Sequence, residues 1–413
     1  MSRSVLAIGV LFGAIASAQP VTYFPPIAAR TSPPLLGTGA VGVTLWLSDP
    51  GVDVGESILF ATTPQSATTS FTLGTLSAAG VPNLPATIDG IATAPGVLVQ
   101  GTDRTLIAVA SSGQVLVGTI ESGAFVSRGP NQTVTGGPPL ALAVSADGGA
   151  VLLVSDATAT QFTRWELGLP SGTADAVKGL TAAALTEPAR SLLLDGIRNQ
   201  VLVGGNTLGN LYRLDARLDA GPVLIDSALL SQGRLAPPVT GLALYQGAVA
   251  AYLLVTSSQG LTVYDLLQAD PLPGAFRVIP RDDAGQLSGP TGVAVTNLPA
   301  GAAFPAGVIA LGDATDRGLA LVRWDVLAQD AGLAIDTSFD PRGLPSDAGP
   351  TDGGCTTPGG CGPSGNPIPP VPPGPYVPVP DTSSCASAPG GAAALGALVT
   401  LLALVSPRRR QRR

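Results

Sequence analysis

Short apolar runs alternate with clusters of glycine, proline, asparagine and aspartate between about residues 41 and 327. Six of these runs are four to six residues long and partly β-branched: 57–62, 105–110, 150–154, 200–203, 251–255 and 307–311. Runs of this length, bounded by turn-forming residues, are typical of strands rather than helices. The pattern predicts an all-β fold, with helix confined to the two ends of the chain.

A second strand with an aromatic or apolar pair follows most of these runs, at 164–167, 211–214, 262–265 and 322–325. The recurrence, at roughly 45 to 55 residues, is the period of a propeller blade. About six blades fit, so we expect a six-bladed β-propeller over 41–328, with function at one end of its central channel. A pair of β-sandwiches would not repeat at this spacing, and a solenoid would repeat more strictly. Trp46, Trp165 and Trp324 are expected in the core between blades.

The N-terminal 18 residues have the layout of a secretory signal peptide, with Arg3, an apolar run from 5 to 15 and Ala16-Ser17-Ala18 before Gln19. A short buried helix is the alternative. An N-terminal extension, 19–40, would then precede the propeller. The sequence therefore predicts export of the protein.

The C-terminal part changes composition after residue 328. Residues 329–384 are rich in Pro, Gly and Asp, and the stretch 367–380 is expected to be an extended, disordered polyproline spacer. An apolar segment, 386–405, follows Cys385 and precedes five arginines, which resist transfer across a bilayer. We therefore expect a C-terminal apolar helix in 385–413 that contacts the membrane, and a mature domain on the outer side of it.

This tail resembles the C-terminal sorting signal of myxobacterial surface proteins, because a cysteine, small residues, an apolar helix and an arginine cluster follow one another. The resemblance implies processing near the cysteine, with Cys385 as the anchoring position, and a location in the cell envelope or at the outer surface. An ordinary transmembrane anchor is the alternative.

Charge and residue usage limit the chemistry of the exported chain. Without the two end segments it carries 28 acidic and 15 basic residues, a net charge of −13, and Lys178 is its only lysine. Such a surface repels nucleic acid, and it repels polyphosphates unless a cation bridges them. The chain has no histidine, which excludes common zinc sites and histidine-based triads. Cys355 and Cys361 lie close together in a Gly/Pro segment and are expected to form a small disulfide. We expect a monomer.

Four motifs occur in the order of the acidic signatures of β-propeller phytases: Val41-Gly42-Val43-Thr44-Leu45-Trp46, Thr186-Glu187, Val239-Thr240-Gly241-Leu242 and Gly289-Pro290-Thr291-Gly292-Val293. The corresponding family signatures are roughly D-D-P-A-I-W, T-E-G-L, I-E-G-L and D-T-D-G-I-D. The stretch 251–260 is also close to the family's Y-L-M-A-S-S-Q-G. The chain thus resembles this family over about 41–328. The resemblance implies a propeller whose carboxylates hold calcium ions that bind and hydrolyse phosphate esters.

Most of those carboxylates are replaced here. Where the family has acids, this chain has Val41, Gly42, Thr240, Gly289 and Thr291, and Gly204-Gly205 stands where an acidic pair is expected. The carboxylates retained are Glu187, Asp89 and Asp313. The resemblance implies that Glu187 is the catalytic acid and that Asp89 and Asp313 are calcium ligands. A calcium site takes six to eight oxygens, several of them carboxylates, so three acids could hold one weakly bound ion. An isolated aspartate at a loop tip is also a common turn residue.

The sequence therefore predicts an exported, surface-anchored, phytase-like propeller that has lost most of its calcium-dependent phosphatase site. Its expected role is to bind or display a phosphate ester or an envelope ligand. One alternative is a divergent phosphatase that hydrolyses phosphate monoesters such as phytate with fewer calcium ions. The other is a structural envelope protein whose propeller spaces other parts.

Overall fold

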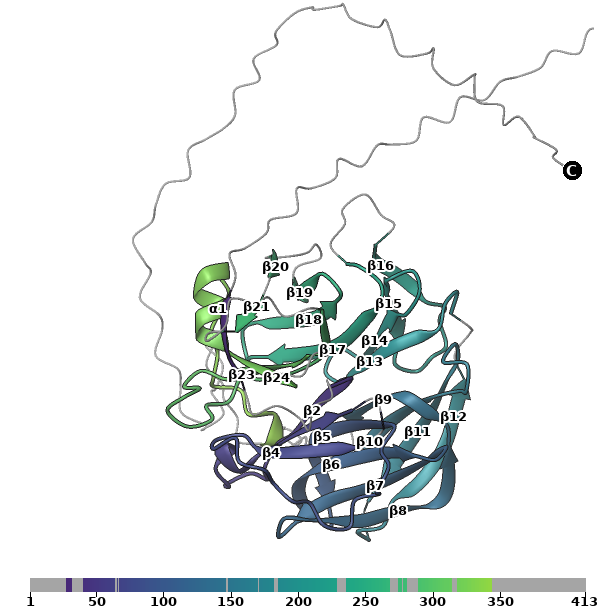
Figure 1. Ribbon diagram of the computed structural model, residues 1–413. Coiled ribbons are helices and arrows are strands. Elements are labelled where there is room, and N and C mark those ends of the chain that lie inside the picture. The colour runs from purple at the N-terminus through teal and green to yellow at the C-terminus, as the bar shows by residue number, and fades with distance from the viewer. Residues whose placement is uncertain are drawn as a thin grey trace, which may run out of the picture. The chain divides into compact units, whose positions relative to one another are not determined.

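The computed structural model describes residues 27–31 and 40–343, apart from 64, 66, 146–147, 170, 182–184, 229–234, 268–273, 277, 281–288 and 314–317. The signal peptide, most of the linker, Cys355, Cys361, Cys385 and the apolar tail lie outside these residues. The described chain is all-β, as expected, and forms several antiparallel sheets (Figure 1).

The first three sheets follow one another along the chain. Sheet 1 contains β2 (Gly42–Trp46), β3 (Ile58–Thr62) and β4 (Thr68–Thr72). Sheet 2 contains β5 (Gly90–Val99), β6 (Thr102–Ser111), β7 (Gln114–Glu121) and β8 (Ala124–Thr135). Sheet 3 contains β9 (Gly137–Val144), β10 (Ala150–Ser155), β11 (Phe162–Gly168) and β12 (Asp175–Thr181).

The remaining sheets continue this order. Sheet 4 contains β13 (Ala189–Asp195), β14 (Gln200–Gly205), β15 (Asn210–Asp215) and β16 (Val223–Ser227). Sheet 5 contains β17 (Val239–Gln246), β18 (Ala251–Ser257), β19 (Gly260–Asp265) and β20 (Gly274–Phe276). Sheet 6 contains β22 (Pro290–Thr296), β23 (Val308–Asp313) and β24 (Leu319–Arg323), joined by β1 (Ile27–Thr31) and β21 (Val278–Pro280).

Strand β1 completes the last sheet from the other end of the chain. It pairs antiparallel with β24, with Arg30 opposite Leu321, and parallel with β21. The N-terminal segment therefore contributes to the packed unit before residue 41, where we expected the domain to begin.

Several second strands are buried along their whole length because both of their faces are covered. Every residue of β10 and β18 is buried, and these strands contain the predicted runs 150–154 and 251–255. Outer strand β16, by contrast, exposes Val223, Leu224 and Ile225.

Neighbouring sheets are joined by buried apolar clusters in the described part of the chain. One cluster joins each successive pair of sheets from 1 to 6, and a further one joins sheet 6 to sheet 1 through residues such as Phe304 and Leu59. Trp46, Trp165 and Trp324 each lie in one of these clusters at 6%, 6% and 0% exposure, which confirms their predicted core positions.

The first strands of the sheets also contact one another in order. Strand β2 contacts β5, and the series continues through β9, β13, β17 and β22, which in turn contacts β2. These strands thus lie around a common space.

Two features of the C-terminal part differ from expectation. We predicted a strand over 322–325, but β24 ends at Arg323 and helix α1 (Trp324–Ala331) follows it, beside β24 in Figure 1. The expectation that helix is confined to the chain ends was therefore wrong. Trp324 is buried on the first turn of α1, and Gly332 ends the helix in the left-handed conformation, with φ of 66°. Short 3₁₀ turns lie at Val54–Glu56 (η1) and Pro341–Gly343 (η2).

Candidate functional site

The residues expected to form the phosphatase site lie near the beginnings of the first strands, on separate sheets. Asp89 directly precedes β5, Glu187 precedes β13, and Asp313 ends β23. Among the described residues, no group of three or more Asp, Glu, Cys or His side chains is placed to hold a metal ion.

The Glu187 carboxylate is engaged by the turn between β14 and β15. Its Oε2 accepts hydrogen bonds from the backbone N–H groups of Thr207 and Leu208, both at 2.7 Å, and its Oε1 accepts one from Asn210 at 3.2 Å. The residue is 3% exposed. A carboxylate that accepts three backbone N–H groups fixes the turn in place.

Gly205 makes room for this carboxylate. A Cβ atom at Gly205 would lie 2.1 Å from Glu187 Oε1, and a Cβ at Gly204 would lie 2.4 Å from Ser191 Oγ. No side chain fits at either position unless its neighbours move. Gly204 and Gly205 are therefore part of the packing around Ser191 and Glu187.

The two aspartates expected as calcium ligands lie in different surroundings. Asp89 is exposed, and its Oδ2 accepts the N–H of Ser112 at 3.1 Å. Asp313 is 1% exposed, its N–H donates to the Gly318 carbonyl at 2.9 Å, and its carbonyl accepts the N–H of Ala40 at 2.8 Å.

Hydroxyl groups join neighbouring sheets at the same end of the first strands. They donate to backbone carbonyls of the next sheet or of the segment leading into it: Ser191 to Val239 (3.0 Å), Thr240 to Pro290 (2.5 Å), and Thr291 to Ala40. A further bond runs from Thr44 to Ile91 (3.2 Å). Thr240 and Thr291, the positions at which the resemblance led us to expect acids, thus make contacts between sheets.

Two glycines bring the backbones of these strands together. A Cβ at Gly241 would lie 2.7 Å from the backbone nitrogen of Val293, and a Cβ at Gly292 would lie 2.9 Å from that of Val43. Strands β17, β22 and β2 are therefore packed backbone to backbone at their beginnings.

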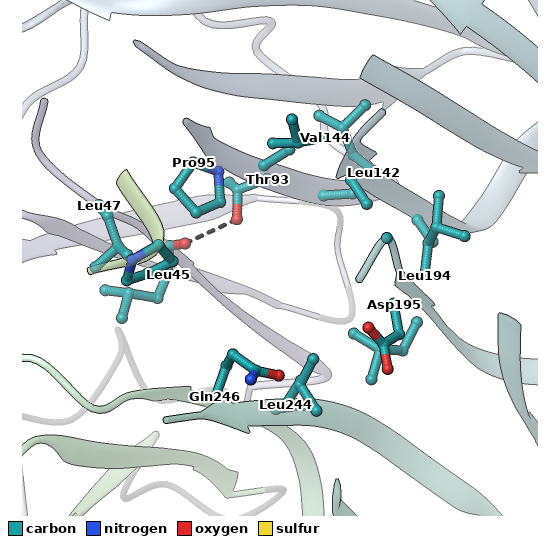
Figure 2. A pocket seen from close by; sticks show the side chains of 18 of the residues that line it. Leu45, Leu47, Thr93, Pro95, Leu142, Val144, Leu194, Asp195, Leu244 and Gln246 are labelled. Atoms are coloured by element: carbon teal, nitrogen blue, oxygen red, sulfur yellow. Dashed lines mark hydrogen bonds between the residues drawn. The ribbon is translucent and has the colours of Figure 1, made fainter. Parts of the chain in front are cut away.

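A cavity of about 560 Å³ lies along the middle and final parts of the first strands. All six first strands contribute to its lining. Figure 2 shows side chains of β2, β5, β9, β13 and β17 around it, among them Leu45, Leu142, Val144, Leu194 and Leu244. The wall is thus mainly aliphatic.

The polar groups of this wall are largely paired within the protein. Thr93 Oγ1 donates to the Leu45 carbonyl at 2.8 Å, drawn as a dashed line in Figure 2. The side chain of Asp195 is fully buried and accepts from Arg198 Nη1 at 3.0 Å and from Gln200 Nε2 at 3.1 Å. Arg198 Nη1 also donates to Gln246 Oε1 at 3.0 Å.

The C-terminal strap, residues 332–343, runs over several sheets near the ends of the first strands, and its Phe339 and Pro341 line the cavity. Asn297 Nδ2 donates to the carbonyls of Asp336 (3.2 Å) and Phe339 (2.6 Å). The Arg342 side chain, paired with Asp340, donates to the Val52 carbonyl at 2.9 Å. The packed chain therefore continues past residue 328, where we expected the linker to begin.

Asp336 holds the strap to sheet 5. Its Oδ2 accepts the N–H groups of Ala248 (2.6 Å) and Val249 (3.0 Å), and its Oδ1 accepts the N–H and hydroxyl of Ser338. Burial acts to raise the pKa of Asp336, but these hydrogen bonds lower it below its usual value. Tyr245 exchanges hydrogen bonds with the backbone of Asp336, and burial raises the pKa of Tyr245 to about 12.

Reasoning from the sequence predicted a central channel but not the residues that line this cavity, and it missed the strap. The available signal was that several first strands end in a polar residue after an apolar run, as at Asp195, Gln246 and Thr296. The expected membrane segment, 386–405, lies outside the described residues, and within them no helix is long and apolar enough to cross a bilayer.

Comparison with known proteins identifies no family. No protein-family model matches the chain, and no curated protein matches it. Among solved structures, U3-55K has a TM-score of 0.41 at 10% identity, covering 71% of this chain and 84% of its own. The computationally designed Ika8 protein has a TM-score of 0.37 at 11% identity, covering 71% of this chain and 99% of its own. Both likenesses are too weak to support an assignment.

Proposed function

We propose that the six sheets are the blades of a six-bladed β-propeller. Three observations support this proposal: the first strands contact one another in sequence order and from β22 to β2, a buried cluster lies between each neighbouring pair of sheets, and β1 completes the last sheet. Joining the two ends of a chain in one sheet is an effective way to hold a ring of sheets together, since it leaves few free edges.

We further propose that this propeller is a binding or display module, with a phytase-like ancestry but an impaired or lost phosphatase site. The observation that carries this proposal is the Glu187 carboxylate, which accepts three backbone N–H groups of the β14–β15 turn. A catalytic carboxylate needs a free oxygen directed at substrate, metal or water. The close approach of β17, β22 and β2 at Gly241 and Gly292 supports the same proposal.

The alternative remains a divergent phosphatase with one calcium ion. The assay that separates the two is phosphate release from phytate by the full chain, with and without millimolar calcium. The binding-module proposal predicts no calcium-dependent release above the protein-free control. Sustained release that requires calcium would overturn it.

We propose that the protein is exported and held at the cell envelope through its C-terminal tail. The two end patterns, a signal peptide and an arginine-flanked apolar segment after Cys385, support this proposal. Cys385→Ala is expected to leave the propeller folded and to change the cell fraction and the intact mass of the protein. If parent and variant share one location and both retain the arginine tail, the segment 386–405 is a plain membrane anchor.

A further inference from the structure

The cavity inside the ring of first strands has apolar surface that the fold itself does not cover. Five aliphatic residues on first strands line it and are only half buried: Ile91, Val144, Leu193, Leu244 and Val295. Aliphatic surface of this kind is stabilised when an apolar group replaces the water next to it. A pocket of 300–1,000 Å³, mostly apolar and formed in advance, is the usual form of a small-molecule site.

The polar side chains of the wall largely have hydrogen-bond partners within the protein already, so they offer few hydrogen bonds to a ligand. Thr44 and Thr93 both donate to backbone carbonyls of a neighbouring sheet, and Asp195 is paired with Arg198. A ligand rich in hydrogen-bonding groups would lose its water there without gaining matched partners. The wall therefore favours a hydrocarbon over a sugar or a phosphate ester.

Charge narrows the choice further. Two carboxylates, Asp103 and Asp195, are among the lining residues, and no lysine or arginine is. Asp195 is neutralised by Arg198, which does not itself line the cavity, so an anionic group placed there would be desolvated without a lining cation to compensate it. The wall thus favours an uncharged molecule over a fatty acid.

The dimensions of the cavity suit a single alkyl chain. At about 30 Å³ for a group the size of a water molecule or a methylene, the cavity has room for roughly 18 such groups. Because all six first strands line it over several residues each, the space extends along these strands.

We propose that the cavity binds the alkyl chain of an uncharged amphiphile, of the chemical class of long-chain alcohols. This inference rests on the proposed binding function and names the class of ligand for it. The chain lies between the first strands, and the polar end group lies near the strap, where Gln246 and Asn297 line the cavity.

The test is competition by 1-alkanols of 6 to 20 carbons, a series that extends past the estimated capacity of the cavity, against the neutral fluorophore N-phenyl-1-naphthylamine bound to the full chain. Each added methylene is expected to strengthen binding about fourfold, the equivalent of about 0.8 kcal/mol, until the cavity is filled and the affinity levels off. Decanoate is expected to bind about tenfold more weakly than 1-decanol, because no lining cation compensates the desolvation of its carboxylate.

Two matched substitutions locate the binding. Val144→Phe fills part of the cavity and is expected to weaken 1-decanol binding about tenfold, while Val177→Phe, on the exposed face of β12, is expected to leave it within about twofold. Leu244→Ala enlarges the cavity and should move the levelling-off to longer chains, which serves as a second variant if Val144→Phe does not fold.

Several results would overturn the inference: no saturable binding of fluorophore or alkanol, equal affinity of decanoate and 1-decanol, or equal effects of Val144→Phe and Val177→Phe. Affinity that rises with chain length without levelling off would indicate adsorption to an outer surface and would also overturn it. Phosphate release from phytate is a separate measurement, so failure of the proposed function and failure of this inference can be told apart.

Discussion

Replacing Glu187 by glutamine tests whether this carboxylate holds the turn between β14 and β15. The side chain is almost fully buried, and its two oxygens accept three backbone N–H groups. Glutamine keeps the shape but has one acceptor oxygen and an NH₂ group in place of the second. If its oxygen serves Thr207 and Leu208, its NH₂ group faces the N–H of Asn210, and two donors then oppose each other.

The size of the effect follows from these contacts. Hydrogen bonds to a charged group contribute about 1.5–3 kcal/mol each, and a buried donor left without an acceptor costs about 1–3 kcal/mol. We therefore expect Glu187→Gln to reduce the free energy of unfolding by about 2–3 kcal/mol. For a domain of this size each kcal/mol lowers the melting temperature by roughly 2 °C, which gives a fall of about 4–6 °C.

Differential scanning calorimetry of the full chain measures this fall. Glu166→Gln is the matched control, because Glu166 lies on the exposed side of β11 and pairs with Arg164 at the surface, where an ion pair contributes at most about 1 kcal/mol. If both variants melt at the same temperature as the parent, the carboxylate of Glu187 does not hold the turn, and the reasoning from its hydrogen bonds is refuted.

Three further predictions concern the strap, the core and calcium. Asp336→Asn should weaken the fall of stability at acid pH, measured by urea unfolding. The lowered pKa of Asp336 stabilises the parent above the unfolded pKa of 3.8, and this stabilisation is lost as the pH falls through the folded pKa. Parallel pH profiles of parent and variant would contradict this. Trp324→Ala should cost about 3–5 kcal/mol in chemical denaturation, because the buried indole stacks on Tyr245 at 3.8 Å, and a cost below about 1 kcal/mol would be inconsistent with that packing. Millimolar calcium should stabilise the protein by only about 0.4 kcal/mol if a site of millimolar affinity exists, and a rise of more than about ten degrees in melting temperature would speak against this.

The strands of the fold could be predicted from the sequence because the pattern that indicates each strand lies within a few consecutive residues. The runs 150–154 and 251–255 are continuous and apolar, and they form strands whose residues are all buried. Helix α1 was missed because residues 322–325 resemble the end of an apolar strand, although the helix-forming residues 327–329 before Gly332 were a local signal for it; the position of Trp324 against Tyr245 was not predictable. That contact joins distant parts of the chain, so no local pattern reports it.

The candidate site was less accessible for the same reason. The sequence identifies Glu187 as a retained acid but does not indicate that its partners are the backbone amides of residues 207–210. The strap gives no composition signal, since Asp336 and Arg342 lie in a stretch that resembles a linker. Their roles depend on contacts with residues about 90 and 290 positions away.

The central claim is that the phosphatase site is impaired or lost. Its most direct test is phosphate release from phytate, measured with calcium and again with a chelator for the parent, Glu187→Gln and Glu166→Gln. The account predicts that all three proteins release phosphate at the protein-free rate under both conditions, while Glu187→Gln alone is less stable. Calcium-dependent release by the parent that Glu166→Gln retains and a folded Glu187→Gln loses would contradict it, and would establish Glu187 as a catalytic residue.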